Sequence, residues 1–303
     1  MARLKQPKPI PQMTVAEFEA LFPDEAACDA YLIARRWPDG VTCPRCGSTR
    51  AYKLATMENK WECPDCSKGG YRFSHLVGTI FENTNKDLRD WFRVIHLMLT
   101  SKKGISALQV MRYMGFGSYK TAHYMCHRIR VALFEKQPGQ LAGIVEIDET
   151  YIGGKAKNKH WDKRGDGGGP TAGGMTPVAG AVSRKGKVVA RVLAVVNRET
   201  VTRFVREAVS HKVSLLASDD SRSYSSLKFE YPHKAVNHSA GEYVVGAVHT
   251  NTIEGFWSIM KRGVVGTFHK VSAKYLPLYV AEFEFRYNNR HNPDIFGTAV
   301  GSC

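Results

Sequence analysis

Two sets of residues in this sequence have the types and spacing that chemistry requires, and the first is a set of cysteines. Four of the seven cysteines form two CxxC pairs, Cys43 with Cys46 and Cys63 with Cys66, with sixteen residues between the pairs. Each CxxC turn can present two sulfurs, so two turns complete a tetrahedral zinc site. An odd cysteine count in a basic chain fits metal binding better than a disulfide framework. We therefore predict a zinc ribbon with one structural Zn²⁺; unmetallated or redox-active cysteines are the alternative.

The second set is acidic. Asp148 ends the largely apolar run 144–147, Asp219 comes at the end of the apolar run 213–217, and Glu254 lies in a helical pattern. Carboxylates are the hard ligands that Mg²⁺ and Mn²⁺ prefer, and two such ions about 3.5–4 Å apart can clamp both reacting oxygens of a phosphodiester. Two strand-end aspartates and one helix glutamate could converge on such an ion pair. Alternatively, the aspartates terminate strands and the glutamate is a solvated helix residue.

The pattern around Glu254 is that of an amphipathic helix. Its apolar face consists of residues at i, i+3, i+4 and i+7, namely Ile253, Phe256, Trp257 and Met260. Thr250 or Asn251 can serve as the N-cap. Lys261 follows Glu254 by two helical turns, so both side chains lie along the same side of the helix.

Composition indicates a globular protein with a polyanionic partner. The chain has 303 residues, 43% of them hydrophobic and 11% aromatic, with a net charge of +15 and a pI of about 9.5. No run of 18 apolar residues and no signal-peptide core are present, so we expect a cytoplasmic protein without a membrane partner.

The N-terminal half is expected to be helical around the ribbon. We assign 1–38 to a basic arm with helices that begin at Thr14 and Asp24, 39–75 to the zinc ribbon, and 84–137 to further helices. Within the last region, a helix at 105–114, a glycine turn and a basic helix at 118–130 have the outline of a helix-turn-helix, which Lys120, Arg128 and Arg130 would use to contact DNA. An ordinary helical hairpin is the alternative.

The region 141–295 has the character of an α/β domain. Strands are expected at 143–147, 178–182 and 188–196, then a helix from Asn197 or Thr200, the strand before Asp219 and the Glu254 helix. This order resembles a ribonuclease-H-like core. The insert after Asp148 is either a flexible linker or a basic flap that would bind DNA through Lys155, Lys157 and Lys159.

Three blocks of residues resemble a known family. They are the CxxC pairs, the run from Val145 to Lys155 and the run from Val248 to Trp257, which extends to Arg262 and beyond. The chain resembles bacterial insertion-sequence transposases with an N-terminal zinc ribbon and an ISXO-like DDE domain, which has the ribonuclease-H-like (retroviral integrase-like) fold.

The resemblance implies a function and assigns residues to it. The carboxylate triad falls on Asp148, Asp219 and Glu254, with Lys261 as the basic residue; Asp220 and Asn251 are the alternatives for the second and third positions. Such a protein would bind terminal inverted repeats and target DNA, associate with the nucleoid when bound, and cut and join strands with two Mg²⁺ or Mn²⁺ ions. Arg262 would contact DNA.

Joining two element ends implies at least a dimer on DNA. A different class of function is a regulator that binds DNA through the ribbon and helix-turn-helix and whose nuclease-like domain is degenerate. A nuclease without strand transfer is a third possibility. The regulator is expected to bind DNA even without Asp148 and to show no metal-dependent cleavage, and a joining assay with pre-cleaved DNA ends separates the nuclease from the transposase.

Overall fold

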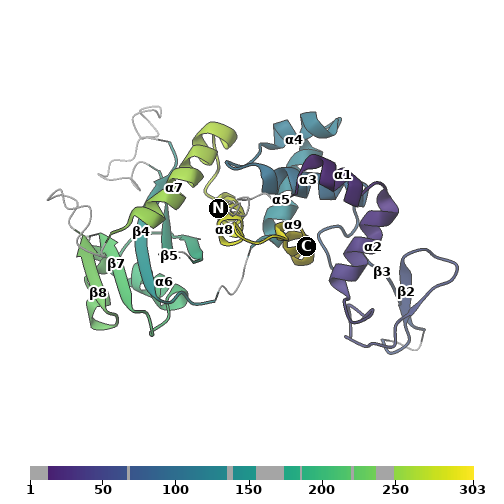
Figure 1. Cartoon of the computed structure of the whole chain (residues 1–303), viewed down its shortest axis with the longest axis horizontal. Helices are drawn as coiled ribbons and strands as arrows, with labels where there is room; N and C mark the ends of the chain where they lie inside the picture. Colours follow the sequence, from purple (N-terminus) through teal and green to yellow (C-terminus); the bar gives the residue numbers. More distant parts are fainter. Residues whose placement is uncertain are drawn as a thin grey trace, which may run out of the picture. The chain divides into compact units, whose positions relative to one another are not determined.

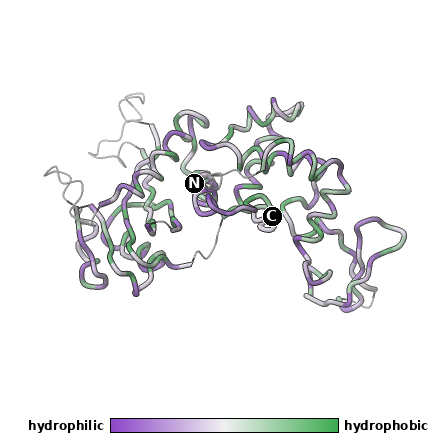
Figure 2. The backbone as a smooth tube through the Cα atoms, in the orientation of Figure 1, coloured by the Kyte–Doolittle hydropathy of each residue, from purple (hydrophilic) through white to green (hydrophobic). Residues whose placement is uncertain are grey.

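The computed structural model describes residues 13–66, 69–134, 139–154, 174–184, 186–219, 222–236 and 249–303. The chain forms two compact units (Figure 1). The first contains the described residues up to Leu133 together with the C-terminal segment Arg290–Cys303, and the second runs from Phe134 to Asn289. Hydrophobic and hydrophilic residues alternate along the helices of both units, as expected for amphipathic helices (Figure 2).

The first unit is mainly helical. Its helices are α1 (Val15–Leu21), α2 (Glu25–Arg36), α3 (Leu88–Thr100), α4 (Ala107–Met114), α5 (Tyr119–Ala132) and α9 (Ile295–Ser302). Thr14 forms the predicted capping box with Glu17, and Asp24 caps α2. The helix, glycine turn and helix predicted at 105–130 are confirmed as α4 and α5, with Gly115 in the left-handed conformation between them.

The C-terminal helix α9, which the sequence analysis did not anticipate, completes the core of this unit. It packs against α2 and α3. Phe296 on α9 lies within 5.4–6.1 Å, between ring centroids, of Phe18, Phe22, Tyr31 and Phe92. The last residues of the chain therefore belong to the same core as the first described helix.

A small antiparallel sheet carries the cysteine pairs. Its strands are β1 (Tyr52–Lys53), β2 (Lys60–Cys63) and β3 (Tyr71–Ser74), paired in the order β1-β2-β3. These strands match the predicted ribbon. A cluster of Trp37, Trp61 and Phe73 with Cys43 and Cys63 forms its core.

The second unit is built on a mixed five-stranded sheet in the order β6-β5-β4-β7-β8. The strands are β4 (Ile144–Ile152), β5 (Thr176–Ser183), β6 (Val188–Val192), β7 (Leu215–Asp219) and β8 (His233–Val236). Strand β5 runs antiparallel to both of its neighbours, β4 and β6, whereas β7 runs parallel to β4, and β8 parallel to β7. The mixed α/β architecture that we predicted is confirmed.

Helices cover both faces of this sheet. Helix α6 (Arg198–Ala208) and the short helices η3 (Arg222–Tyr224) and η4 (Leu227–Phe229) lie on one face, where Val145, Ile147 and Leu216 meet Phe204 and Tyr224. Helices α7 (Asn251–Gly263) and α8 (Leu276–Asn288) cover the other, where Val178 and Val182 meet Trp257. A π-helix, η6 (Val264–Phe268), follows α7 directly.

Two expectations for this unit need correction. Asp148 does not end a strand: β4 continues to Ile152 because residues 148–152 pair with Gly180 through Thr176 on β5. The third strand ends at Val192, short of the predicted 196, because pairing with β5 ends there. Strand β8 was not predicted.

Candidate metal centres

The four cysteine sulfurs form a compact cluster. The Sγ atoms of Cys43 and Cys66 lie 3.4 Å apart, and those of Cys46 and Cys63 lie 3.7 Å apart. With Zn–S bonds of about 2.3 Å, the sulfurs of a tetrahedral site lie roughly 3.8 Å apart. All four donor atoms lie within 4.8 Å of one another. The cluster therefore fits one structural Zn²⁺.

The local turn prepares the thiol of Cys43 for a metal. Burial tends to raise the pKa of Cys43, but the backbone N–H groups of Cys46 and Arg45 donate to its sulfur, and the net result lowers its pKa to about 7. Thiolates are the form that binds zinc. The CxxC turn thus supplies both spacing and hydrogen bonds.

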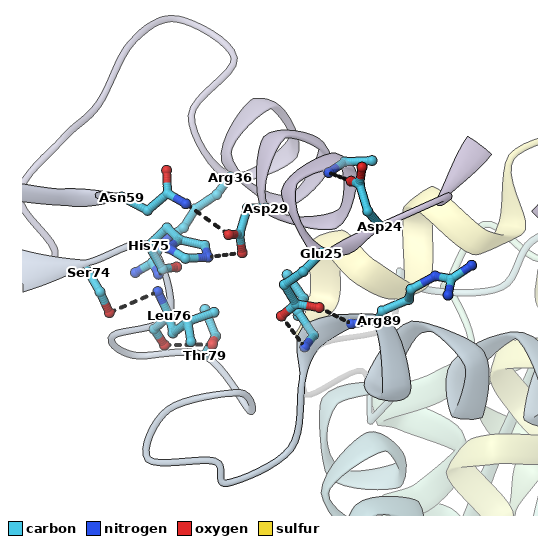
Figure 3. Close-up of polar contacts among 12 residues, drawn as sticks. Asp24, Glu25, Asp29, Arg36, Asn59, Ser74, His75, Leu76, Thr79 and Arg89 are labelled. Carbon is cyan, nitrogen blue, oxygen red and sulfur yellow. Dashed lines mark hydrogen bonds and ion pairs between the residues drawn. The ribbon is translucent and has the colours of Figure 1, made fainter. Parts of the chain in front are cut away.

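Polar contacts join the ribbon to α2 (Figure 3). The carboxylate of Asp29 on α2 accepts from Nδ2 of Asn59 at 2.8 Å and lies 2.7 Å from Nε2 of His75. The guanidinium of Arg36 donates to the backbone carbonyls of His75, at 2.6 Å, and Val77. These contacts fix the sheet on the helix that precedes it.

The acidic residues meet on one face of the larger sheet. In the parallel pairing of β4 with β7, Glu146 lies opposite Ala217, so two residues further on Asp148 lies beside Asp219. Helix α7, which carries Glu254, packs over β4 and β5 on this face. Within the described residues, the four cysteines are the tightly gathered ligand group, and the carboxylates are more widely spaced.

Trp257 fixes the carboxylate of Asp148. Its indole Nε1 donates to Oδ2 at 3.1 Å. The ring lies directly over Gly180, the residue opposite Asp148 on β5, and a Cβ added there would come within 2.5 Å of the ring. Gly180 therefore makes room for the side chain that orients Asp148.

The surroundings of Asp148 favour its protonated form in the absence of cations. Burial is the largest cause that raises its pKa, to about 7. The carboxylates of Glu149, Asp219 and Glu254 act in the same direction, which also indicates that these acids lie close together. A divalent cation would reverse this preference.

Glu254 is exposed on the first turn of α7. Its Oε1 accepts from the hydroxyl of Thr250 at 2.9 Å. The alternative ligand Asn251 is also exposed and is the first residue of the helix. Lys261 and Arg262 are exposed in its last turn.

Two further acids of β4 support this site, and sequence reasoning missed both. Glu149 accepts a hydrogen bond from the hydroxyl of buried Tyr224, which ties the segment after Asp219 to β4. Glu146 is fully buried and contacts Arg184 and the start of α7. Glu146 lies within a largely apolar run, and a charged residue in a buried strand is itself a signal of a specific partner.

The basic residues of α5 that we predicted to contact DNA differ in how exposed their side chains are. Lys120 is exposed on α5, and Arg128 is partly exposed and donates to the carbonyl of Glu82 and the hydroxyl of Tyr124. Arg130 is only 1% exposed, because it lies on the inward face of α5 with Ile129. It is therefore not available on this surface as we predicted. Three predicted contacts and one alternative ligand lie outside the described residues: Lys155, Lys157, Lys159 and Asp220.

Comparisons with known proteins match both halves of the chain. The family model of the transposase zinc-ribbon domain matches residues 23–69, and that of the ISXO2-like transposase domain matches residues 140–288. A protein in transposable element ISH50 of Halobacterium salinarum is 29% identical over 276 residues, which cover 85% of this chain and 89% of that protein. Among the described residues, no helix is long and apolar enough to cross a membrane.

Proposed function

Because this chain belongs to the insertion-sequence transposases that combine a transposase zinc ribbon with an ISXO2-like transposase domain, we propose that it cuts and joins DNA at the ends of an insertion sequence. The proposed ligands of two Mg²⁺ or Mn²⁺ ions are Asp148, Asp219 and Glu254. The observation that best supports this assignment is that neighbouring strands β4 and β7 carry the two aspartates under the helix that carries the glutamate.

We further propose that the second unit has a ribonuclease-H-like core. The support is its strand order, β6-β5-β4-β7-β8, with three antiparallel strands followed by two parallel ones. Asp219 is the last residue of β7. We prefer it over Asp220 because the parallel pairing of β7 with β4, continued by two residues, sets Asp219 beside Asp148. Glu254 is preferred over Asn251 because it is anionic and acts on the pKa of Asp148.

The proposed reaction has two phosphoryl-transfer steps. Water attacks the phosphorus at the element end, and the bond to the 3′ oxygen breaks, leaving a 3′-hydroxyl. That hydroxyl attacks a target phosphorus and displaces the target's own 3′ oxygen, so the number of phosphodiester bonds is unchanged in this second step. When bound, two divalent ions would stabilise charge on the attacking and leaving oxygens.

The chain's own residues prepare this chemistry. Trp257 orients Asp148 through its indole N–H. Because the pKa of Asp148 is raised to about 7, its carboxyl group releases a proton when a cation binds near neutral pH. Lys261, exposed two turns beyond Glu254, would hold a DNA phosphate.

DNA recognition is proposed for the first unit and for basic residues of the second unit. Helix α5 would contact a groove through Lys120 and Arg128, while Arg262 and the insert with Lys155, Lys157 and Lys159 would contact phosphates. The strongly positive chain suits this role. Bringing two element ends together requires at least a dimer on DNA.

Strand transfer tests this function directly. Purified protein is mixed with pre-cleaved terminal-repeat DNA, target DNA and Mg²⁺, and joined products are measured for wild type and for Asp148→Ala, Asp219→Ala and Glu254→Ala. Among these four proteins we expect only wild type to join strands, and we expect all four to bind DNA. Asn251→Ala and Asp220→Ala serve as matched neighbours that should still join. Binding without joining by wild type would contradict this function; metal-dependent cleavage of uncut repeat DNA would then favour the nuclease, and its absence the non-catalytic regulator.

A further inference from the structure

Helix α7 begins without a cap from its own first residues. The hydroxyl of Thr250, the N-cap, donates to Glu254 and makes no bond to the helix backbone. The first N–H groups of a helix have no partners within the helix, so a helix start needs acceptors from elsewhere. In α7 these acceptors come from a strand more than a hundred residues earlier.

The acceptor is the carboxylate of Glu146 on β4. One of its oxygens, Oε2, accepts from the backbone N–H of Thr252 at 2.8 Å and of Ile253 at 3.1 Å. The other, Oε1, accepts from the hydroxyl of Thr252 at 2.9 Å. Glu146 is 0% exposed, so each of these bonds replaces one that water would otherwise make.

Among the described residues, two cationic or titratable groups, those of Arg184 and His249, face this buried carboxylate. Arg184 donates from Nε to Oε1 at 2.7 Å and from its Nη2 to the carbonyl of His249 at 3.2 Å. The ring Nδ1 of His249 lies 3.2 Å from Oε1, at ion-pair distance but without hydrogen-bond alignment. The arginine thus compensates the charge and also holds the residue just before the N-cap.

This arrangement links two of the proposed ligands. Glu146 and Asp148 are two residues apart on one strand, so their side chains point to the same face of the sheet. Glu254 follows Thr252 and Ile253, whose N–H groups Glu146 binds, by one or two residues. The buried side chain of Glu146 therefore fixes the start of α7 relative to β4, the strand that carries Asp148. It does so beside a cluster of carboxylates that repel one another.

We propose that Glu146 is a positioning residue, which caps α7 from β4 and holds Glu254 at the distance from Asp148 that a divalent ion requires. The proposal rests on the proposed function of these two acids. Groups that orient metal ligands from behind commonly change metal affinity by about 10–100-fold when they are replaced.

The chain offers a matched control elsewhere. Helix α3 also lacks a side-chain cap of its own, and the carboxylate of Glu25 on α2 accepts from the backbone N–H groups of Leu88 at 2.5 Å and Arg89 at 2.9 Å. Figure 3 shows this carboxylate against the start of α3. Glu25 therefore makes the same kind of cap in the other unit.

The experiment compares Glu146→Gln, Glu25→Gln and Glu254→Ala in the full-length protein by two measurements. Amide hydrogen exchange reports the first turns of α7 and α3, and calorimetric titration with Mn²⁺ reports metal affinity. For Glu146→Gln we expect faster exchange at Thr252 and Ile253, together with a loss of Mn²⁺ affinity of about 10-fold or more. Glu25→Gln should loosen only α3 and leave Mn²⁺ affinity unchanged.

A milder variant keeps the test valid if Glu146→Gln does not fold. Thr252→Val removes only the hydroxyl bond to Glu146 and should weaken Mn²⁺ binding in the same direction by a few-fold, with little effect on exchange elsewhere in the sheet. Unchanged Mn²⁺ affinity in both Glu146→Gln and Thr252→Val, while Glu254→Ala binds weakly, would overturn the positioning role. Unchanged affinity in Glu254→Ala would instead show that the proposed function of Glu254 is wrong.

Discussion

The zinc ribbon and the acidic site hold their candidate ligands together by opposite means. The four cysteines lie within residues 43–66, on two local turns whose sulfurs are already at zinc-binding distances. The three acids lie at 148, 219 and 254, and a strand register and a packed helix bring them together. We therefore expect the ribbon to depend on its metal for folding, and the proposed acidic site to depend on the fold for its metal.

In the metal-free protein, the ribbon and the second unit are expected to behave differently. The core of the ribbon is smaller than the cores of the second unit, so we expect zinc to contribute much of the folding energy of the ribbon. In the second unit, large cores on both faces of the sheet bury Asp148 and hold the acids close, and the pKa of Asp148 is raised first by this burial and then by the neighbouring carboxylates.

Loss of one zinc ligand should have the largest effect. Cys63→Ser removes a buried thiolate, and structural zinc sites typically contribute about 10–16 kcal/mol of binding energy that is also folding energy. We expect loss of zinc by mass spectrometry and loss of amide protection in β2 and β3. Cys126→Ser, at a buried cysteine outside the cluster, should keep its zinc. Full zinc content in Cys63→Ser would contradict the ribbon assignment.

Replacing Asp148 should change how stability depends on pH. A carboxyl group whose pKa is raised in the folded protein stabilises it at low pH, and this contribution is lost as pH rises through the folded pKa of about 7. For the metal-free protein we expect a loss of up to about 1.4 kcal/mol per pH unit between about pH 4 and 7.

The total loss for this group is about 4 kcal/mol, given ordinary and folded pKa values of 3.8 and about 7. Urea unfolding of wild type and Asp148→Asn across this window isolates the contribution, because Asn cannot ionise. Added Mg²⁺ should restore stability to wild type most strongly above pH 7. Parallel pH profiles for the two proteins would show that Asp148 is not under electrostatic strain.

The contact of the Trp257 ring with Gly180, which holds the indole against Asp148, should be sensitive to a single added methyl group. Gly180→Ala places a Cβ within 2.5 Å of the Trp257 ring, and such overpacking typically costs about 1–3 kcal/mol. We expect this loss in urea unfolding, with weaker strand transfer because the indole N–H shifts away from Asp148. Gly255→Ala, in α7 with open space around it, should be neutral or stabilising. Equal effects of the two substitutions would argue against the contact.

The smallest effect is expected where the ribbon meets α2. Asp29→Asn removes the charge that faces His75, and a partly buried hydrogen bond of this kind contributes about 1 kcal/mol. Amide exchange in β3 should become faster without loss of zinc. Arg72→Gln, which breaks an exposed ion pair with Glu62 in the same sheet, should change exchange less. A larger effect of Arg72→Gln would reverse our ranking of these contacts.

The sequence predicted local features well, because short-range patterns determine them. The cysteine spacing, the Thr14 capping box and the apolar stripe of α7 each lie within a few residues and appear in the structure as expected. The three acids remain a proposed ligand set, and the extension of β4 past Asp148, which depends on pairing with β5, is not visible in the local sequence.

Long-range contacts account for what the sequence could not show. Glu146 caps a helix 106 residues later, Gly180 accommodates Trp257, and α9 fills a core made largely by α1, α2 and α3. None of these pairs has a sequence pattern of its own. Arg130 illustrates the same limit, since only the packing of α5 shows that its side chain is buried.

Counting both metals in one sample tests the central contrast most directly. Zinc by mass spectrometry and bound Mn²⁺ by electron paramagnetic resonance would be measured for wild type, Asp148→Asn, Asp219→Asn and Glu254→Gln. We expect one zinc in every protein, up to two Mn²⁺ ions in wild type, and a clear loss of Mn²⁺ in each variant. Mn²⁺ binding that is the same in all four proteins would contradict the assignment of the acidic site.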